Sequence, residues 1–259
     1  MIPQKAVPIK LLQKQVWREG LVSLRFEKPD SFTFKPGQFV RLGIEKDFAE
    51  GTAYEGRPYS MASLPEDPFL EFFIVEVQGG RVSSALTTLE PGQSCYLEPE
   101  LWGSMLPERI PGGNTLWCIS SGTGLAPFMS ILQDGSVWKQ WPNIVLVHSV
   151  RYSEDLAYTN LIQKFTDDSR FGANPSHSFC YVPVITREAT QFLSQRIPAL
   201  IESGDLEATA ERKLDPVESR VLLCGNPEML KSARNVLKTK GFVSPRRGQP
   251  GNLLAENLW

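Results

Sequence analysis

The chain has 259 residues, of which 41% are hydrophobic and 22% charged, and its formal net charge at pH 7 is -2. This length favours two domains of ordinary size, and the composition is that of a globular protein rather than a disordered one. The small net charge gives no overall attraction to nucleic acid or to an acidic membrane, and no apolar run approaches the roughly 20 residues that span a bilayer.

Up to about residue 100, short strands alternate with turns that contain Pro-Gly pairs, as in Lys35-Pro36-Gly37 and Glu90-Pro91-Gly92. This punctuation is typical of a small antiparallel barrel or sandwich. The residues Ser83–Leu89 interrupt the pattern as a short helix. The predicted strands are Val22–Phe26, Gln38–Ile44, Leu70–Val77 and Ser94–Leu97.

After Pro111-Gly112-Gly113, apolar strands alternate with helices, which indicates a parallel sheet covered on both faces. We therefore expect an antiparallel β domain over residues 1–109 and an α/β domain over residues 110–259. The predicted strands are Thr115–Ser120, Asn143–Val150, Phe179–Thr186 and Arg220–Cys224. The predicted helices begin at Ala126 and Asp155, lie near Ile197–Ser203, and run from Pro227 to about Lys240.

The start of the chain and its cysteines bear on location and metal content. The opening MIPQKAVPIKLLQKQ breaks its apolar residues with Lys, Pro and Gln, so it lacks a signal-peptide core and we expect a cytoplasmic protein. Cys95, Cys118, Cys180 and Cys224 are isolated from one another, and His148 and His177 are the only histidines. We expect no metal site, so redox chemistry would need an organic cofactor.

Two strand-to-helix turns of the second half suit a phosphate group. Ser120–Pro127 carries Gly122, Thr123 and Gly124, where the backbone can approach a pyrophosphate at a helix start. Pro127 replaces the third glycine of the usual dinucleotide motif, so a plain tight turn stays an alternative. The second turn is Cys224-Gly225-Asn226-Pro227, in which Asn226 and Pro227 also suit an ordinary helix start.

The choice of nicotinamide coenzyme depends on the residues just after the second and third strands of the second half. An NAD site usually places a carboxylate there, whereas a 2′-phosphate needs guanidinium groups. The second strand ends at Arg151, the third at Thr186-Arg187, and Arg196 comes after them. These residues favour NADP.

The first half carries Arg57-Pro58-Tyr59-Ser60 and Gly80-Arg81-Val82-Ser83. An arginine and a hydroxyl-bearing helix start can hold a second pyrophosphate, and a tyrosine offers a flat face to a ring. These two motifs, S-G-T-G-x-x-P and C-G-N-P succeed one another in an order that resembles the ferredoxin–NADP reductase family. VHSVRY at 147–152, RIPALIESG at 196–204 and AENLW at the end resemble its bacterial flavodoxin/ferredoxin–NADP reductase branch.

The resemblance implies a barrel that binds FAD tightly but non-covalently, an α/β domain that binds NADP, and hydride transfer between the two. It implies catalytic positions at Tyr59, Ser60, Cys224 and Trp259. It implies FAD contacts from Arg57, Pro58, Tyr59, Ser60, Phe73, Ile74, Val75, Glu76, Arg81, Val82, Ser83, Thr123, Ala255, Glu256 and Trp259. It implies NADP contacts from Thr123, Gly124, Arg151, Thr186, Arg187, Arg196, Cys224, Gly225 and Asn226.

The resemblance also implies a ferredoxin or flavodoxin, both acidic, as the partner in single-electron exchange. We expect a monomer and, from the charge and the apolar runs, neither nucleic acid nor a membrane as a partner. Three other functions stay open on the sequence. A flavin reductase would treat the flavin as a dissociating substrate, and an NADP-sensing or scaffold protein would have no catalysis. Retained FAD and NADPH oxidation distinguish these two from the expected reductase. The third is a reductase subunit of a larger oxygenase, although no iron–sulfur domain is expected in this sequence.

Overall fold

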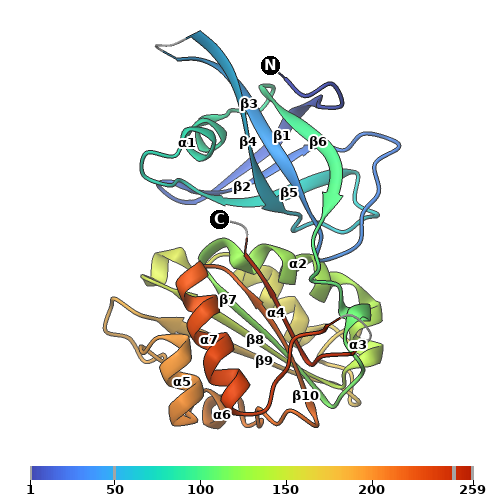
Figure 1. Ribbon diagram of the computed structural model, residues 1–259, viewed down its shortest axis with the longest axis vertical. Coiled ribbons are helices and arrows are strands. Elements are labelled where there is room, and N and C mark those ends of the chain that lie inside the picture. The colour runs from blue at the N-terminus through green and yellow to red at the C-terminus, as the bar shows by residue number, and fades with distance from the viewer. Residues whose placement is uncertain (1, 49–50, 247–248, 258–259) are drawn as a thin grey trace.

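The computed structural model describes residues 2–48, 51–246 and 249–257, which form an antiparallel barrel on top of a parallel α/β sheet (Figure 1). Within these ranges, no helix has the length and apolarity needed to cross a membrane. The predicted order, antiparallel β first and α/β second, is confirmed.

The barrel contains a six-stranded antiparallel sheet in the order β4-β3-β6-β1-β2-β5. Its outer strands meet where Met61, just after β4, bridges to Phe72 of β5, and this contact closes the barrel. Alternating apolar residues point inward, and Val82 and Leu86 of helix α1 (Arg81–Thr88) complete the core. The strands are β1 (Val7–Arg18), β2 (Leu21–Glu27), β3 (Phe39–Phe48), β4 (Gly51–Ser60), β5 (Phe69–Val75) and β6 (Ser94–Trp102).

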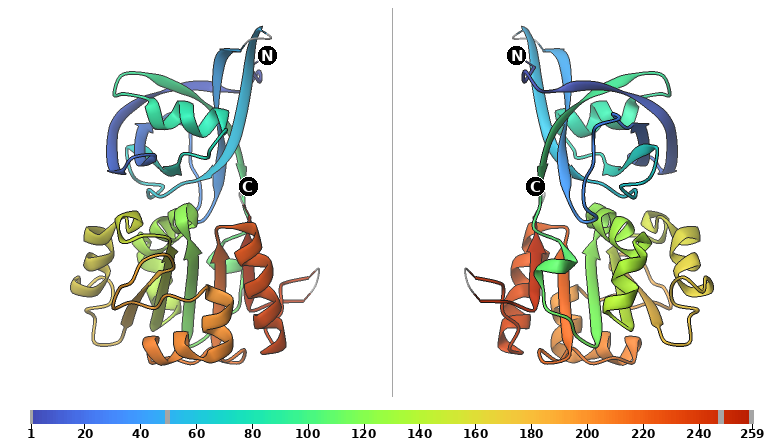
Figure 2. Two further views of the ribbon diagram at one scale, coloured as in Figure 1. Left: turned by 90° about the vertical axis from the view of Figure 1, so that its left-hand side faces the viewer. Right: turned by 90° about the vertical axis from the view of Figure 1, so that its right-hand side faces the viewer.

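The second sheet is parallel, in the order β11-β10-β7-β8-β9. Its strands are nearly continuous apolar runs because helices cover both faces (Figure 2). The strands are β7 (Thr115–Ser121), β8 (Asn143–Val150), β9 (Ser178–Ile185), β10 (Ser219–Cys224) and β11 (Leu253–Glu256). The helices are α2 (Ala126–Gln133), α3 (Gly135–Gln140) and α4 (Thr159–Asp167), then α5 (Ile197–Ser203), α6 (Asp205–Ala210) and α7 (Pro227–Thr239).

The predicted helix start at Asp155 was wrong. Ser153–Asp155 forms only a 3-10 turn, η3, and α4 begins four residues later, at Thr159. The preceding Tyr158 adopts a left-handed conformation with φ 60°, which breaks the chain direction between the two. The segment from η3 to Tyr158 therefore lies outside any α-helix, and it contacts the barrel.

The two halves share a core. Phe73 and Ala62 of the barrel belong to the same buried apolar cluster as Phe128 of α2. Around this cluster, Ser130 of α2 donates to the carbonyl of Ser63 at 2.7 Å, within a buried setting. The contact is therefore core-like, and it presents the carboxyl ends of β7 and β10 to the barrel.

Candidate functional site

A cavity of about 620 Å³ lies between the barrel and the carboxyl ends of β7 and β10. Open parallel sheets bind ligands at this edge. From the barrel it is lined by Glu55, Arg57, Pro58, Tyr59, Ser60, Phe73, Val75, Val77, Gly79, Gly80, Arg81, Val82 and Ser83. From the α/β half it is lined by Thr123, Gly124, Ala126, Cys224 and Gly225.

The four residues Arg57-Pro58-Tyr59-Ser60 end β4, which is the edge strand of its sheet. An edge position tolerates Pro58, which has no N–H to donate to a neighbouring strand. Burial raises the pKa of the Tyr59 hydroxyl to about 12, although Arg57 opposes the shift, so this phenol is neutral at physiological pH. The Ser60 hydroxyl is buried without a hydrogen-bond partner among the described residues. A ligand in the cavity that offers it a partner fits this arrangement.

Positive charge gathers where the cavity meets the start of α1. Glu55 lies 2.9 Å from Arg81 and 3.8 Å from Arg57, so one carboxylate faces two guanidinium groups. Ser83, in the first turn of α1, accepts a hydrogen bond from the Val77 N–H at 3.0 Å and so holds the loop before the helix. A helix start with two arginines beside it suits a pyrophosphate.

The two glycine turns of the α/β half fit into each other at the cavity wall. A Cβ on Gly124 would lie 2.4 Å from the Cys224 carbonyl oxygen, and one on Gly225 would lie 2.3 Å from Ser121 Oγ. The Asn226 N–H donates to that same Ser121 Oγ at 2.9 Å. Only glycine permits this close approach, so the backbones of the two turns pack directly against each other at the cavity wall.

Two further groups shape the turns. Burial raises the pKa of the Cys224 thiol well above its usual value, with a smaller contribution from Glu256, so Cys224 lines the cavity as a neutral thiol. The Asn226 side chain accepts hydrogen bonds from the N–H groups of Glu228 and Met229, so it caps α7 as an ordinary helix start would.

His148 was missed by the sequence reasoning as a supporting residue. It is fully buried on β8, and its Nε2 lies 3.1 Å from the Gly122 carbonyl oxygen. Burial lowers the pKa of His148 to about 4, against the hydrogen bond to Gly122, so the neutral ring donates to that carbonyl. Its only sequence signal is a polar residue inside an apolar strand.

Among the predicted flavin contacts that the structure describes, four lie outside the lining of this cavity. The Ile74 side chain faces the barrel core, since successive residues of a strand point to opposite sides. Glu76 accepts a hydrogen bond from Ser84 at 2.6 Å. Ala255 and Glu256 end β11, and Trp259 lies outside the described residues.

Glu256 is a buried carboxyl group beside the barrel. Its Oε1 accepts a hydrogen bond from the Ser104 N–H at 2.7 Å, and its Oε2 has no partner among the described residues. Burial raises the pKa of Glu256, and the bonds from Ser104 oppose the shift. In the register of the sheet, Glu256 pairs with Cys224, so β11 ends next to the cavity wall.

Two of the three predicted arginines, Arg151 and Arg187, follow neighbouring strands at one edge of the sheet, and Arg196 immediately precedes α5. Arg151 comes directly after β8 and Arg187 just after β9, and the Arg187 N–H donates to the Arg151 carbonyl oxygen at 2.9 Å. Thr186 donates to the Val150 carbonyl oxygen through both its N–H, at 3.0 Å, and its hydroxyl, at 3.1 Å. Arg151, Arg187 and Arg196 are exposed, and within the described ranges none forms an ion pair.

A barrel and a parallel α/β sheet that share a cavity of this chemistry define a flavin-dependent oxidoreductase that uses a nicotinamide dinucleotide. Residues 6–100 match the family model described as "FAD-binding domain", and residues 118–235 match "Oxidoreductase NAD-binding domain". The chain belongs to the flavodoxin/ferredoxin–NADP reductase family. The predicted family and the two predicted cofactors, FAD and NADP, are confirmed.

Individual relatives match the chain over nearly its whole length. It is 37% identical to "Flavodoxin/ferredoxin--NADP reductase" of Escherichia coli (strain K12), over 96% of this chain and 97% of the relative. It is 35% identical to "Ferredoxin--NADP reductase" of Azotobacter vinelandii, over 96% of each chain. A solved ferredoxin NADP+ reductase from Neisseria gonorrhoeae with bound FAD and NADP is 32% identical, with a TM-score of 0.89 over 99% of this chain and 100% of that one.

Proposed function

We propose that the chain transfers a hydride between NADPH and FAD, and single electrons between FAD and a ferredoxin or flavodoxin. One observation carries the proposal. Tyr59 and Ser60, expected at the flavin, and Thr123 and Cys224, expected at the nicotinamide, line the same cavity. Bound FAD supplies the redox chemistry, and the chain supplies orientation and electrostatics.

The chain's own residues then have separate tasks. The Ser60 hydroxyl, which has no partner among the described residues, would donate a hydrogen bond to the flavin. The Tyr59 ring would stack on the flavin ring. Arg57, Arg81 and the first turn of α1 hold the FAD pyrophosphate. The backbone of the two glycine turns accommodates the nicotinamide end of NADPH, and Arg151, Arg187 and Arg196 bind its 2′-phosphate.

Two measurements test this function against its alternatives. A yellow colour that survives gel filtration is expected of retained FAD, whereas a colourless protein that reduces added flavin would be a flavin reductase. The purified protein should oxidise NADPH with the organism's own ferredoxins and flavodoxins as acceptors. Failure with these carriers and with an artificial acceptor would contradict the proposed enzyme and favour an NADP-sensing role.

The remaining assignments are also proposals. We propose residues 1–109 as the FAD-binding unit and residues 110–259 as the NADP-binding unit. We further propose a cytoplasmic monomer that needs neither nucleic acid nor a membrane.

The acidic carrier is proposed to dock on a basic run after residue 230. Between Lys231 and Ala255 the sequence has no acidic residue. The run consists of Lys231, Arg234, Lys238, Lys240, Arg246 and Arg247. Lys231, Lys238 and Arg246 are exposed, while Lys240 pairs with Glu207 at 3.0 Å and Arg247 lies outside the described residues. The loop between α7 and β11, which carries Arg246, projects from the α/β half (Figure 2).

Reversing Arg246 and Arg247 to glutamate should slow carrier reduction about tenfold or more at low salt, because charge complementarity steers association. The loss should shrink as salt rises, and reduction of a small artificial acceptor should be unchanged. Stopped-flow kinetics over a salt series measures both. Carrier kinetics equal to those of the unaltered protein at low salt would remove the docking proposal.

Trp259 is proposed to cover the flavin face that the nicotinamide must reach. If the uncovered state is about a tenth populated, deleting Trp259 should raise NAD⁺ affinity about tenfold, since apparent affinity scales with the competent fraction. The ratio of the affinity for the phosphorylated coenzyme to that for the unphosphorylated one should become smaller. Titration of the visible flavin spectrum with NADP⁺ and NAD⁺ tests this. Unchanged band shape and affinities would show that Trp259 does not cover the flavin.

A further inference from the structure

Residues 151–158 link β8 to α4 and carry Arg151 at their start. This segment contacts the barrel at two places, although it belongs to the α/β half. The first contact lies within η3 and the second at Tyr158. Together, the two contacts attach the segment that bears Arg151, a proposed 2′-phosphate-binding residue, to strands β1, β2 and β5 of the barrel.

The first contact is made mainly by the buried carboxylate of Asp155, while Glu154 lies 4.0 Å from the same Arg18 Nε. Asp155 Oδ1 accepts a hydrogen bond from Arg18 Nε of β1 at 2.5 Å. Asp155 Oδ2 accepts one from the Tyr152 N–H at 3.1 Å. The two oxygens therefore join the barrel to the backbone immediately after Arg151. Charge-assisted bonds such as the one from Arg18 are short and directional.

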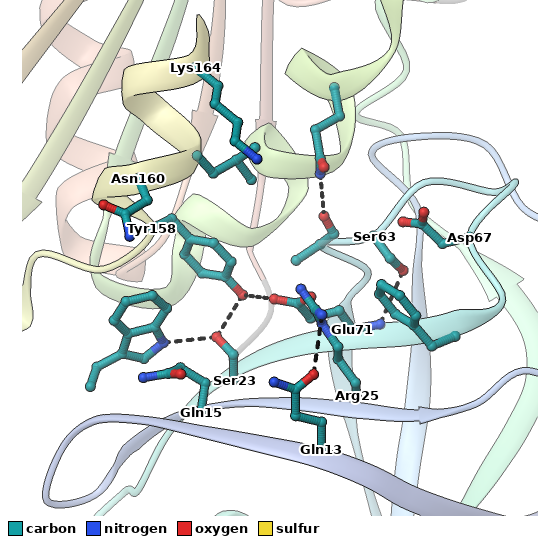
Figure 3. A pocket seen from close by; sticks show the side chains of 15 residues that line it. Gln13, Gln15, Ser23, Arg25, Ser63, Asp67, Glu71, Tyr158, Asn160 and Lys164 are labelled. Atoms are coloured by element: carbon teal, nitrogen blue, oxygen red, sulfur yellow. Dashed lines mark hydrogen bonds and ion pairs between the residues drawn. The ribbon is translucent and has the colours of Figure 1, made fainter.

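The second contact places Tyr158 in the barrel wall (Figure 3). Its hydroxyl donates to Glu71 Oε1 at 2.8 Å and accepts from Ser23 Oγ at 2.7 Å. Its ring lies 5.2 Å from the ring of Trp17 and 5.2 Å from that of Phe73, and the latter lines the flavin cavity. All three polar side chains, Ser23, Glu71 and Tyr158, are buried.

Backbone strain shows that these contacts hold Tyr158 in place. A left-handed conformation at a bulky residue such as Tyr158, with φ 60°, is strained and persists only where the surroundings impose it. Glu71 is itself fixed, because its Oε2 lies 2.6 Å from Arg25 Nε. Figure 3 shows this network on the wall of a second cavity of about 350 Å³ between the barrel and α4.

The segment is also braced to the loop that carries the other arginine. Glu188 accepts hydrogen bonds from the Ser153 N–H at 2.8 Å and from the Ser153 hydroxyl at 2.9 Å. Glu188 is the residue next to Arg187, whose N–H donates to the Arg151 carbonyl. Both arginines therefore depend on where residues 151–158 are held.

We propose that residues 151–158 form an interdomain strap, in which Asp155 and Tyr158 are positioning residues for the phosphorylated adenosine end of NADP(H). The inference rests on the proposed function, and it adds a role for the barrel. Arg18 and Glu71 sit on barrel strands, yet they set the position of Arg151. The preference for NADP over NAD then depends partly on barrel residues that touch neither coenzyme.

The test uses two variants that alter the anchors without altering the arginines of the 2′-phosphate site, Arg18→Ala and Tyr158→Phe. Each should weaken binding of adenosine 2′-monophosphate, measured by calorimetry, about three- to tenfold, which lies in the lower part of the range of couplings between residues in one network. The kcat/KM for NADPH should fall by a similar factor, and that for NADH should not change. The flavin spectrum should stay that of the unaltered protein.

Matched controls separate positioning from general destabilisation. Lys14→Ala removes another cation of β1 from its ion pair with Glu90, and Tyr181→Phe removes a buried phenol that has no partner among the described residues. Neither should change adenosine 2′-monophosphate binding. In an Arg151→Ala background, Tyr158→Phe should cause a smaller loss than in the unaltered protein, because the strap acts partly through Arg151.

Three results would overturn the strap. The first is unchanged binding of adenosine 2′-monophosphate in both variants. The second is an equal loss of kcat/KM for NADPH and NADH. The third is a loss of binding from Tyr158→Phe that adds in full to the loss from Arg151→Ala. An unaltered protein that binds no adenosine 2′-monophosphate and oxidises no NADPH would instead refute the proposed function, and the strap with it.

Discussion

Arg187→Ala is expected to lower kcat/KM for NADPH by about 10- to 150-fold, because a lost hydrogen bond to a charged group is worth roughly 1.5–3 kcal/mol. Arg187 is exposed at the end of β9 and forms no ion pair within the described part of the chain, so its charge is available to a phosphate. NADH lacks the 2′-phosphate, and its kcat/KM should change by less than about twofold. Steady-state assays with both coenzymes and one artificial acceptor measure the ratio.

A second arginine serves as the control for charge alone. Arg170 is exposed in the loop before β9, at the other end of that strand from Arg187, and pairs with Asp168 at 2.6 Å. Arg170→Ala should leave both coenzymes unaffected. Equal losses for NADPH and NADH in Arg187→Ala would exclude Arg187 from the 2′-phosphate site and leave Arg151 and Arg196 as its candidates.

The strands of the α/β half were predictable because burial on both faces leaves a plain signal. β8 was predicted at its observed bounds, Asn143–Val150, and β7 and β10 to within a residue at either end. Each is a continuous apolar run, which few other structures tolerate. The turns after β7 and β10 carry the glycines, so the same stretches of sequence predicted both the sheet edge and its proposed phosphate-binding role.

Three strands were not predicted, each for a physical reason. β1 is long and mostly exposed on one side, so its apolar residues are diluted by lysine and glutamine. β4 contains Pro58, which only an edge strand accepts, and its register with β3 depends on tertiary pairing. β11 has four residues, too few to show a period, and its partner β10 lies some thirty residues earlier in the chain.

The residues of the candidate site likewise include some that were predictable from sequence and some that were not. Tyr59, Ser60, Thr123 and Cys224 could be predicted to share a cavity because their motifs are local and their order is diagnostic. The contact between Tyr158 and Glu71 spans 87 positions of sequence and depends on a left-handed tyrosine. Neither feature has a local signature, since a tyrosine before a helix normally predicts only another buried ring. Long-range polar pairs of this kind can be identified only from a three-dimensional structure.

Gly225→Ala should be the most destabilising of the substitutions considered, by about 2–5 kcal/mol, as overpacking and backbone strain add. A Cβ there would lie 2.3 Å from Ser121 Oγ and 2.6 Å from the Ser121 carbonyl oxygen, and the backbone φ is +135°. Neither neighbour can retreat easily, because Ser121 ends the central strand β7 and binds the Asn226 N–H. Nicotinamide binding should weaken as well, since Gly225 lines the cavity.

Two other glycines separate the two causes. Gly122 has φ +53° but nothing within 4 Å of an added Cβ, so Gly122→Ala should cost about 1 kcal/mol from backbone strain alone. Gly112 has neither a positive φ nor a close neighbour, so Gly112→Ala should be nearly neutral. Thermal unfolding, followed by flavin fluorescence, ranks the stability of the three variants. In a chain of this size, each kcal/mol of lost stability lowers Tm by about 2–4 °C. If Gly225→Ala unfolds within a degree or so of Gly122→Ala, the interlocked turns tolerate a side chain and the cavity wall is not built from bare backbone.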